Sequence, residues 1–253
     1  MTTTFFRVLL FWALTVLALI LGSVLWPDNE VLSIGMAAVL TLLLSLLFTR
    51  WDRIRLSDVG IVPDAGSSRR FLEGVLWGAG LVLFQEAALG VSGVATLTFR
   101  GEGLIPVAGH LALYSLVAWR EETAFRGYLL TRLTGSVRVL YALLIMTALF
   151  CVEHFWGGMN GWQALFGIGA GGLLFGVAAI RSGGIALPMG IHTVWNFGQW
   201  CFGQKDSAGI WQWQIAPEKE GQADFWAYAA YFAGYALVTL VLWFRRKDDS
   251  ARS

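Results

Sequence analysis

The sequence predicts an all-α membrane protein, a polytopic transmembrane helical bundle of about eight spans. Apolar residues make up 57% of its 253 residues and charged residues only 14%. Soluble domains hold about 45–50% apolar and about 25% charged residues. Each span needs about 20 residues, so the chain has room for one bundle but not for a second soluble domain.

The apolar runs, taken in order, define the expected spans. The first two runs are almost free of charge, whereas the fourth, fifth and seventh contain the polar clusters described below. A polar stretch at 51–70 separates the second run from the third. The expected spans are 5–26, 31–49, 71–93, 107–131, 137–156, 161–181, 184–203 and 223–244.

These runs suggest three parts of the chain. Residues 1–70 would form two N-terminal transmembrane helices and a cytoplasmic connector. Residues 71–203 would form the core that carries the polar motifs. Residues 204–253 would form an external loop, the last transmembrane helix and a basic cytoplasmic tail.

The distribution of Lys and Arg predicts the orientation. With eight spans, only Arg100, Lys205 and Lys219 fall in loops on one side. Cytoplasmic loops carry an excess of basic residues, so both termini are expected in the cytoplasm, as suits a bacterial inner membrane. The basic residues on the cytoplasmic side are Arg7, Arg50, Arg53, Arg55, Arg69, Arg70, Arg132, Arg138, Arg181, Arg245, Arg246, Lys247 and Arg252.

Composition also restricts the partners. The formal net charge of +1 argues against nucleic acid, because phosphate binding needs a concentrated basic face. Cys151 and Cys201 fall in expected spans without zinc or redox spacing, so we expect buried thiols rather than a disulfide. The lipid bilayer is the partner that the sequence indicates, and no pattern predicts an oligomeric state.

Three polar clusters lie inside apolar spans. The first contains Glu121, Glu122 and Arg126, the second ends in His154, and the third pairs His192 with Asn196. Ionisable groups at membrane depth are costly and mark functional sites. Glu122 and Arg126 are four residues apart, as are His192 and Asn196, so each pair shares one helix face.

This set of side chains suits hydrolysis of a peptide bond, which requires a water, a base to deprotonate it and donors for the tetrahedral oxyanion. Apolar surroundings and a like-charged neighbour make a carboxylate a stronger base. Arg126 would hold Glu122 ionised and oriented, leaving Glu121 on another face for the water. We therefore expect Glu121 to be the base.

The order Glu-Glu-x-x-x-Arg, Phe-x-x-x-His, His-x-x-x-Asn resembles the CPBP intramembrane proteases, which include the CAAX prenyl endopeptidases and the bacterial Abi-type proteins. The resemblance covers about residues 70–203 and includes Phe125, Gly127 and Pro188 around the motifs. It implies that Glu121 and His154 activate water. It also implies that His192 and Asn196 form the oxyanion hole.

Metal dependence stays open at this point. Glu121, His154 and His192 could supply three zinc ligands, with water as the fourth. However, no His-Glu-x-x-His motif occurs, and Asn196 beside His192 suits an oxyanion hole better than a metal shell. We favour a metal-free water activated by glutamate, with zinc as the alternative.

Two other functions compete with an intramembrane endopeptidase. The same scaffold could be a non-catalytic membrane partner or an immunity-type protein. Buried Glu and His could also form the proton relay of a transporter, although neither repeats nor paired broken helices support that reading. For a protease, the substrate would be a peptide or a membrane-anchored protein, and the chain does not specify a prenylated CAAX peptide.

Three further expectations concern the surroundings of the motifs. Glu86 and Arg120 would each be costly alone, so we expect a buried pair between their helices. Glu153 is left outside the catalytic set. Gly167-x-Gly169-x-x-Gly172 matches a dinucleotide fingerprint only by accident, because no strand precedes it. Gly167, Gly171 and Gly172, with Gly176 beyond, indicate close helix packing instead.

Counting the rise along each helix places the site in the membrane. His154 would lie in the outer part of the hydrocarbon core, and Glu121 and His192 near its middle. We therefore expect a mid-membrane site that is hydrated from the extracytoplasmic side.

Overall fold

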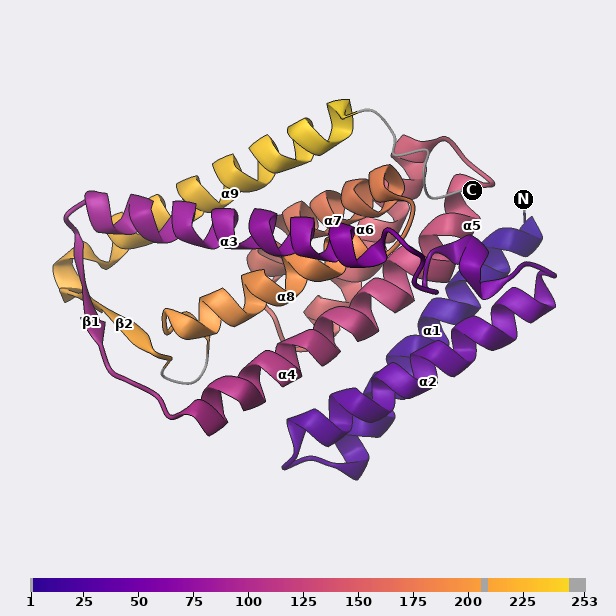
Figure 1. Ribbon diagram of the computed structural model, residues 1–253, viewed down its shortest axis with the longest axis horizontal. Helices are drawn as coiled ribbons and strands as arrows, with labels where there is room; N and C mark the ends of the chain where they lie inside the picture. Colours follow the sequence, from indigo (N-terminus) through magenta and orange to yellow (C-terminus); the bar gives the residue numbers. More distant parts are fainter. Residues whose placement is uncertain (1, 206–208, 246–253) are drawn as a thin grey trace.

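The computed structural model describes residues 2–205 and 209–245, which form a bundle of long helices with one small sheet (Figure 1). The predicted helical, polytopic architecture is confirmed, whereas the expected basic tail from Arg246 onward lies outside the described residues. The α-helices are α1 (Thr2–Leu25), α2 (Glu30–Trp51), α3 (Ser67–Val91), α4 (Leu104–Glu122), α5 (Leu130–Thr134), α6 (Val139–Trp156), α7 (Gly169–Ser182), α8 (Ala186–Cys201) and α9 (Glu220–Phe244).

Two of the expected spans change helix type along their length. In the expected fourth span, α4 runs into a π-helix at Thr123–Leu129 and then into α5. In the expected sixth span, a π-helix at Gln163–Ile168 precedes α7. Such π segments occur frequently at functional sites. The first follows directly after Glu121 and Glu122.

Six helical segments of the described chain are long and apolar enough to cross a membrane. The most apolar are α1 and α2, with mean hydropathies of 2.6 and 2.5. The helices α4 and α8 fall outside this set, because α4 ends in three charged residues and α8 has only 16 residues. The eight expected spans are all helical, but these two depend on their neighbours for burial.

Helix α8 packs along α3 with almost no space between the backbones. A Cβ atom on Gly74 of α3 would lie 2.2 Å from the carbonyl oxygen of Leu187, and one on Gly190 would lie 2.2 Å from that of Phe71. Larger side chains at either glycine would force the helices apart. This contact fixes the depth and rotation of α8, which carries His192 and Asn196.

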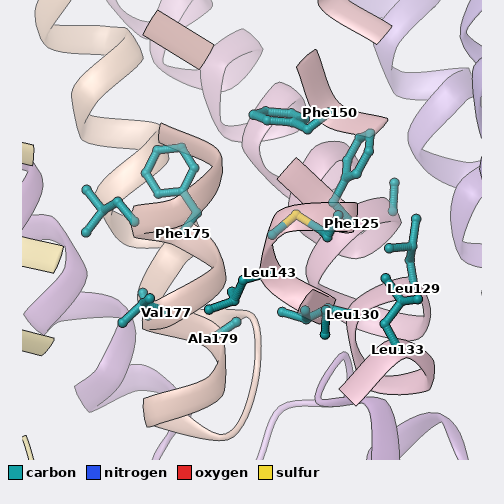
Figure 2. Close-up of a cluster of buried hydrophobic side chains, with 14 of the residues drawn as sticks. Phe125, Leu129, Leu130, Leu133, Leu143, Phe150, Phe175, Val177 and Ala179 are labelled. Atoms are coloured by element: carbon teal, nitrogen blue, oxygen red, sulfur yellow. The ribbon is translucent and has the colours of Figure 1, made fainter. Parts of the chain in front are cut away.

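The apolar core joins the π segment after α4 to α6 and α7 (Figure 2). Phe125, Leu129, Phe150 and Phe175 are among its buried side chains. Of the glycines expected to allow close packing, Gly172 and Gly176 do so on α6: a Cβ on Gly176 would lie 2.6 Å from Leu143 and 2.7 Å from Met146, whereas one on Gly167 would meet nothing within 4 Å. In a bilayer, such van der Waals packing is a main force between helices.

A two-stranded antiparallel sheet was not predicted. Strand β1 (Ala95–Phe99) follows α3, and β2 (Trp211–Ile215) follows α8, with Ala95 opposite Ile215 and Phe99 opposite Trp211. Both strands have only five residues, too few to be recognised beside long apolar runs. The sheet joins the segments that leave α3 and α8 at one end of the bundle (Figure 1).

The expected pair between Glu86 and Arg120 is wrong. Glu86 accepts hydrogen bonds from Trp213 Nε1 at 2.6 Å and from Gln204 Nε2 at 2.8 Å, so it anchors the segment after α8. Arg120 instead forms a buried ion pair with Glu153 of α6. The orientation of α6 decides this pairing, and the sequence alone does not give that orientation.

Candidate active site

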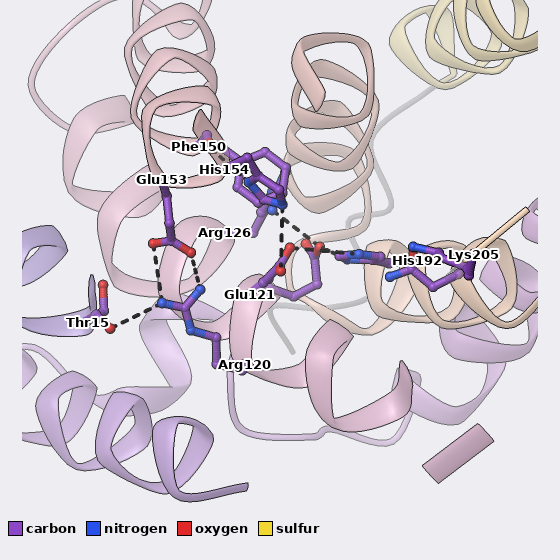
Figure 3. A network of polar contacts seen from close by, with 11 residues as sticks. Thr15, Arg120, Glu121, Arg126, Phe150, Glu153, His154, His192 and Lys205 are labelled. Atoms are coloured by element: carbon purple, nitrogen blue, oxygen red, sulfur yellow. Dashed lines mark hydrogen bonds and ion pairs between the residues drawn. The ribbon is translucent and has the colours of Figure 1, made fainter. Parts of the chain in front are cut away.

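Three helices bring the predicted residues together (Figure 3). Helix α4 contributes Glu121 and Glu122 next to its end, α6 contributes His154 in its last turn, and α8 contributes His192. Because α4 packs against α8 and α2, and α8 packs against α3, the polar side chains they carry are shielded by neighbouring helices.

Glu121 lies between the two imidazoles. Its Oε1 is 3.9 Å from His154 Nε2, and its Oε2 is 3.8 Å from His192 Nε2. These separations are too long for direct hydrogen bonds but suit a contact bridged by water. The side chain of Glu121 is 13% exposed and that of His154 20%, whereas that of His192 is 7% exposed. The site is therefore most open beside His154.

Both histidines are held through their other ring nitrogen. His154 Nδ1 lies 2.9 Å from the carbonyl oxygen of Phe150, one turn earlier on α6. His192 Nδ1 lies 2.9 Å from Oε1 of Glu122. Both of these oxygens accept hydrogen bonds and cannot donate them, so each Nδ1 must carry a proton. In a neutral ring the other nitrogen, Nε2, then presents its lone pair toward Glu121.

The centre of the site thus collects three acceptors: two Nε2 lone pairs and the Glu121 carboxylate. Acceptors do not bond to one another, so a proton on one of these groups, a water molecule or a cation would complete the cluster. Oε2 of Glu121 is buried and has no hydrogen-bond partner in the structure. A water molecule can donate to two of these acceptors and would be polarised by both.

Glu122 and Arg126 form the expected pair along one helix face. Arg126 Nη1 lies 3.3 Å from Glu122 Oε1, and both side chains are completely buried. The same Glu122 oxygen bonds to His192, so a single carboxylate oxygen joins the arginine to the imidazole. Arg126 and Glu122 therefore act on the site through His192.

Two phenylalanines support the histidines and Arg126 together. The guanidinium carbon of Arg126 lies 4.4 Å from the ring centroid of Phe150 and 5.3 Å from that of Phe175. Phe150 meets His154 edge to face, and Phe175 stacks on His192 at 4.7 Å. The Phe-x-x-x-His motif contained Phe150. No pattern in the glycine-rich α7 pointed to Phe175.

Asn196 lies one turn after His192, and its contact in the structure is with Lys205. Lys205 Nζ donates to Asn196 Oδ1 at 3.2 Å and lies 5.5 Å from the ring centroid of Tyr114. This bond leaves the Asn196 amide nitrogen as the group available for donation. The sequence predicts Lys205 in an external loop, and no pattern in it indicates this contact.

The family comparison covers this same segment. The model of the family described as type II CAAX prenyl endopeptidase Rce1-like matches residues 103–198. The match contains Glu121, Glu122, Arg126, His154, His192 and Asn196. Residues 103–198 are thus similar to the Rce1-like family. The resemblance that the motifs predicted is thereby confirmed.

The family assignment supports an intramembrane endopeptidase of the CAAX type and an integral membrane protein. No curated protein matches the chain. The roles of the individual residues therefore rest on the geometry of the site.

Proposed function

We propose that this protein is an endopeptidase that hydrolyses a peptide bond in the bilayer with a water activated by Glu121 and His154. The observation that carries this proposal is the position of Glu121, whose two oxygens lie 3.8 and 3.9 Å from the Nε2 atoms of His192 and His154. Buried acceptors that converge without a direct hydrogen bond provide a place for a polarised water.

Each residue then has a defined task. His154 orients the water, and Glu121 takes a proton from it. As the proton leaves, the oxygen of the water bonds to the carbonyl carbon of the substrate. When the carbon–nitrogen bond breaks, the proton passes to the leaving amine. The surrounding helices exclude bulk water, which strengthens these interactions.

His192 and Asn196 would stabilise the oxyanion. The Asn196 amide nitrogen can donate because its Oδ1 is held by Lys205. When its ring carries both protons, His192 donates from Nε2 to the oxyanion. Its Nδ1–H donates a hydrogen bond to Glu122 at the same time. Arg126 and Glu122 are positioning residues in this scheme, since they reach the site through His192.

We favour a metal-free reaction, and zinc stays the alternative. Glu121, His154 and His192 are the donor types of a catalytic zinc site, in which the metal would acidify a water. Ligands of a tetrahedral zinc lie about 3.3 Å apart, given bonds of about 2.0–2.1 Å. The contacts here are 3.8 and 3.9 Å, and the described residues form no His, Cys, Asp or Glu group arranged to hold a metal. Metal analysis of the purified protein and inhibition by a chelator distinguish the two chemistries.

The experiment that tests this function compares membranes containing the wild type with membranes containing Glu121→Gln. New peptide termini are mapped in water enriched in oxygen-18. We expect cleavage products only with the wild type, with the heavy oxygen in the new carboxyl terminus. If the wild type produces no termini beyond those of membranes that lack the protein, the chain is a non-catalytic membrane partner on a protease scaffold.

We further propose that both termini face the cytoplasm of a bacterial inner membrane and that water enters the site from the outer side. The C-terminal end of α6, which carries His154, would then face outward. Cysteines placed along α4 and α6, in a chain lacking Cys151 and Cys201, report access to an impermeant thiol reagent. Labelling near His154 from the cytoplasmic side alone contradicts this orientation.

A further inference from the structure

A second polar crevice lies between the start of α3, the end of α7, the start of α8 and the end of α9, and contains none of the site residues. Its lining combines three arginines with a single carboxylate, which come from α3, α7 and the residue after α9. The lining residues are Arg70, Glu73, Arg181, Ser182, Leu187, Leu242 and Arg245.

The crevice contains more cationic side chains than carboxylates. Arg245 pairs with Glu73, and Arg70 pairs with Asp64 just before α3. Among the described residues, Arg181 has no carboxylate partner, and its guanidinium carbon lies 5.0 Å from the ring centroid of Trp243. Among residues 2–205 and 209–245, one positive charge of the crevice is therefore left without a counter-charge.

Two donors in the crevice also lack partners. The Nε atoms of Arg70 and Arg181 are buried and form no hydrogen bond in the structure. A buried donor without an acceptor is costly. An anionic oxygen would satisfy such donors and neutralise the surplus charge, and guanidinium groups suit phosphate oxygens because they offer several donors in a plane.

The position of the crevice suits a lipid headgroup. Helix α3 has 25 residues and is about 37 Å long, longer than a hydrocarbon core of about 30 Å. Arg70 lies in its first turn, Arg181 in the last turn of α7, and Arg245 directly after α9. Leu187 and Leu242 add apolar walls below these cations.

We propose that this crevice binds the phosphate of an anionic phospholipid headgroup, with Arg181 as the main contact. Basic pockets between transmembrane helices are known to take such headgroups. The bound lipid would join α3, α7 and α9 around the start of α8, the helix that carries His192. This inference does not depend on the proposed peptidase activity.

Native mass spectrometry of the full-length protein in neutral detergent tests the proposal. Phosphatidylglycerol and phosphatidylcholine are titrated against the wild type and Arg181→Gln. We expect the wild type to prefer phosphatidylglycerol and the variant to lose about fivefold in affinity, the effect of one cation near an anionic lipid. Arg181→Lys keeps the charge and should retain most of the binding.

Arg138→Gln is the matched control, since it removes an exposed arginine that the crevice does not include. It should bind phosphatidylglycerol as the wild type does. Equal affinity of the wild type for both lipids, or unchanged affinity in Arg181→Gln, overturns the proposal. Competition by millimolar inorganic phosphate at constant ionic strength would assign the site to the free anion and overturn the lipid assignment.

Discussion

The end of α4 places two buried ionic groups side by side that differ in how completely they are satisfied (Figure 3). On one side, Arg120 bonds to both oxygens of Glu153 and donates to the carbonyl oxygen of Thr15. On the other, Glu121 and Glu122 each retain a buried oxygen without a hydrogen-bond partner.

This difference separates a structural pair from a reactive site. The buried pair of Arg120 and Glu153 connects α4 to α6 and α1, and within this pair only the Nε of Arg120 is left without a hydrogen-bond partner. A partly satisfied cluster costs stability unless another group completes it. Water and substrate can complete the cluster around Glu121.

The largest effect is expected from Glu121→Gln. The amide keeps the size of the side chain but cannot take a proton, so the cleavage rate should fall about 10²–10⁴-fold. Thermal stability in detergent should stay near that of the wild type, because Glu121 has no hydrogen-bond partner at Oε2 to lose. A variant that cleaves at the wild-type rate would remove Glu121 from the chemistry.

On the structural side, Glu153→Ala should lower the free energy of unfolding by about 3–5 kcal/mol, because Arg120 is left buried without a counter-charge. The matched control is the double variant Arg120→Met with Glu153→Leu, which should recover most of that stability. Cleavage per folded molecule should stay near the wild-type value in the double variant. If its rate collapses while it remains folded, the two sides of α4 are not separate.

Asn196→Ala should reduce the rate about 10²–10³-fold, as expected for the loss of one oxyanion donor. Single-turnover assays measure this effect, which should appear in the chemical step rather than in substrate binding. Asn196→Asp is the companion variant and should be at least as slow, because it removes the donor and adds charge. An unchanged rate in both variants would leave Asn196 with a packing role.

The smallest effect is expected at Lys205. Lys205→Met removes the donor that orients Asn196, so the rate should fall about tenfold, in line with a hydrogen bond from a charged group. In the Asn196→Ala background the same change should have almost no effect. Equal losses in both backgrounds would show that Lys205 does not act through Asn196.

The sequence predicted what depends on spacing within one helix. Glu122, at the end of α4, pairs with Arg126, four residues later in the π-helix. Gly172 and Gly176 of α7 fit against α6 because they share a face. The helices themselves followed from the apolar runs. These features need only the helical period.

Features that depend on how helices rotate against each other were not predictable in this way. Arg120 selects Glu153 rather than Glu86 because of the orientation of α6, and Glu86 instead bonds to Trp213 beyond α8. The contact of Lys205 with Asn196 depends on a turn at Gly203, whose φ is 70°. Both contacts are set by tertiary packing.

The central claim is that Glu121 and His154 act as one unit on a single water. A double-mutant cycle on kcat/KM with Glu121→Gln, His154→Gln and their combination tests it most directly. We predict that the double variant is no slower than the slower single variant, because either change already abolishes the unit. If the losses of transition-state stabilisation in the two single variants add up in the double variant, each residue contributes independently. That result would contradict the proposed unit.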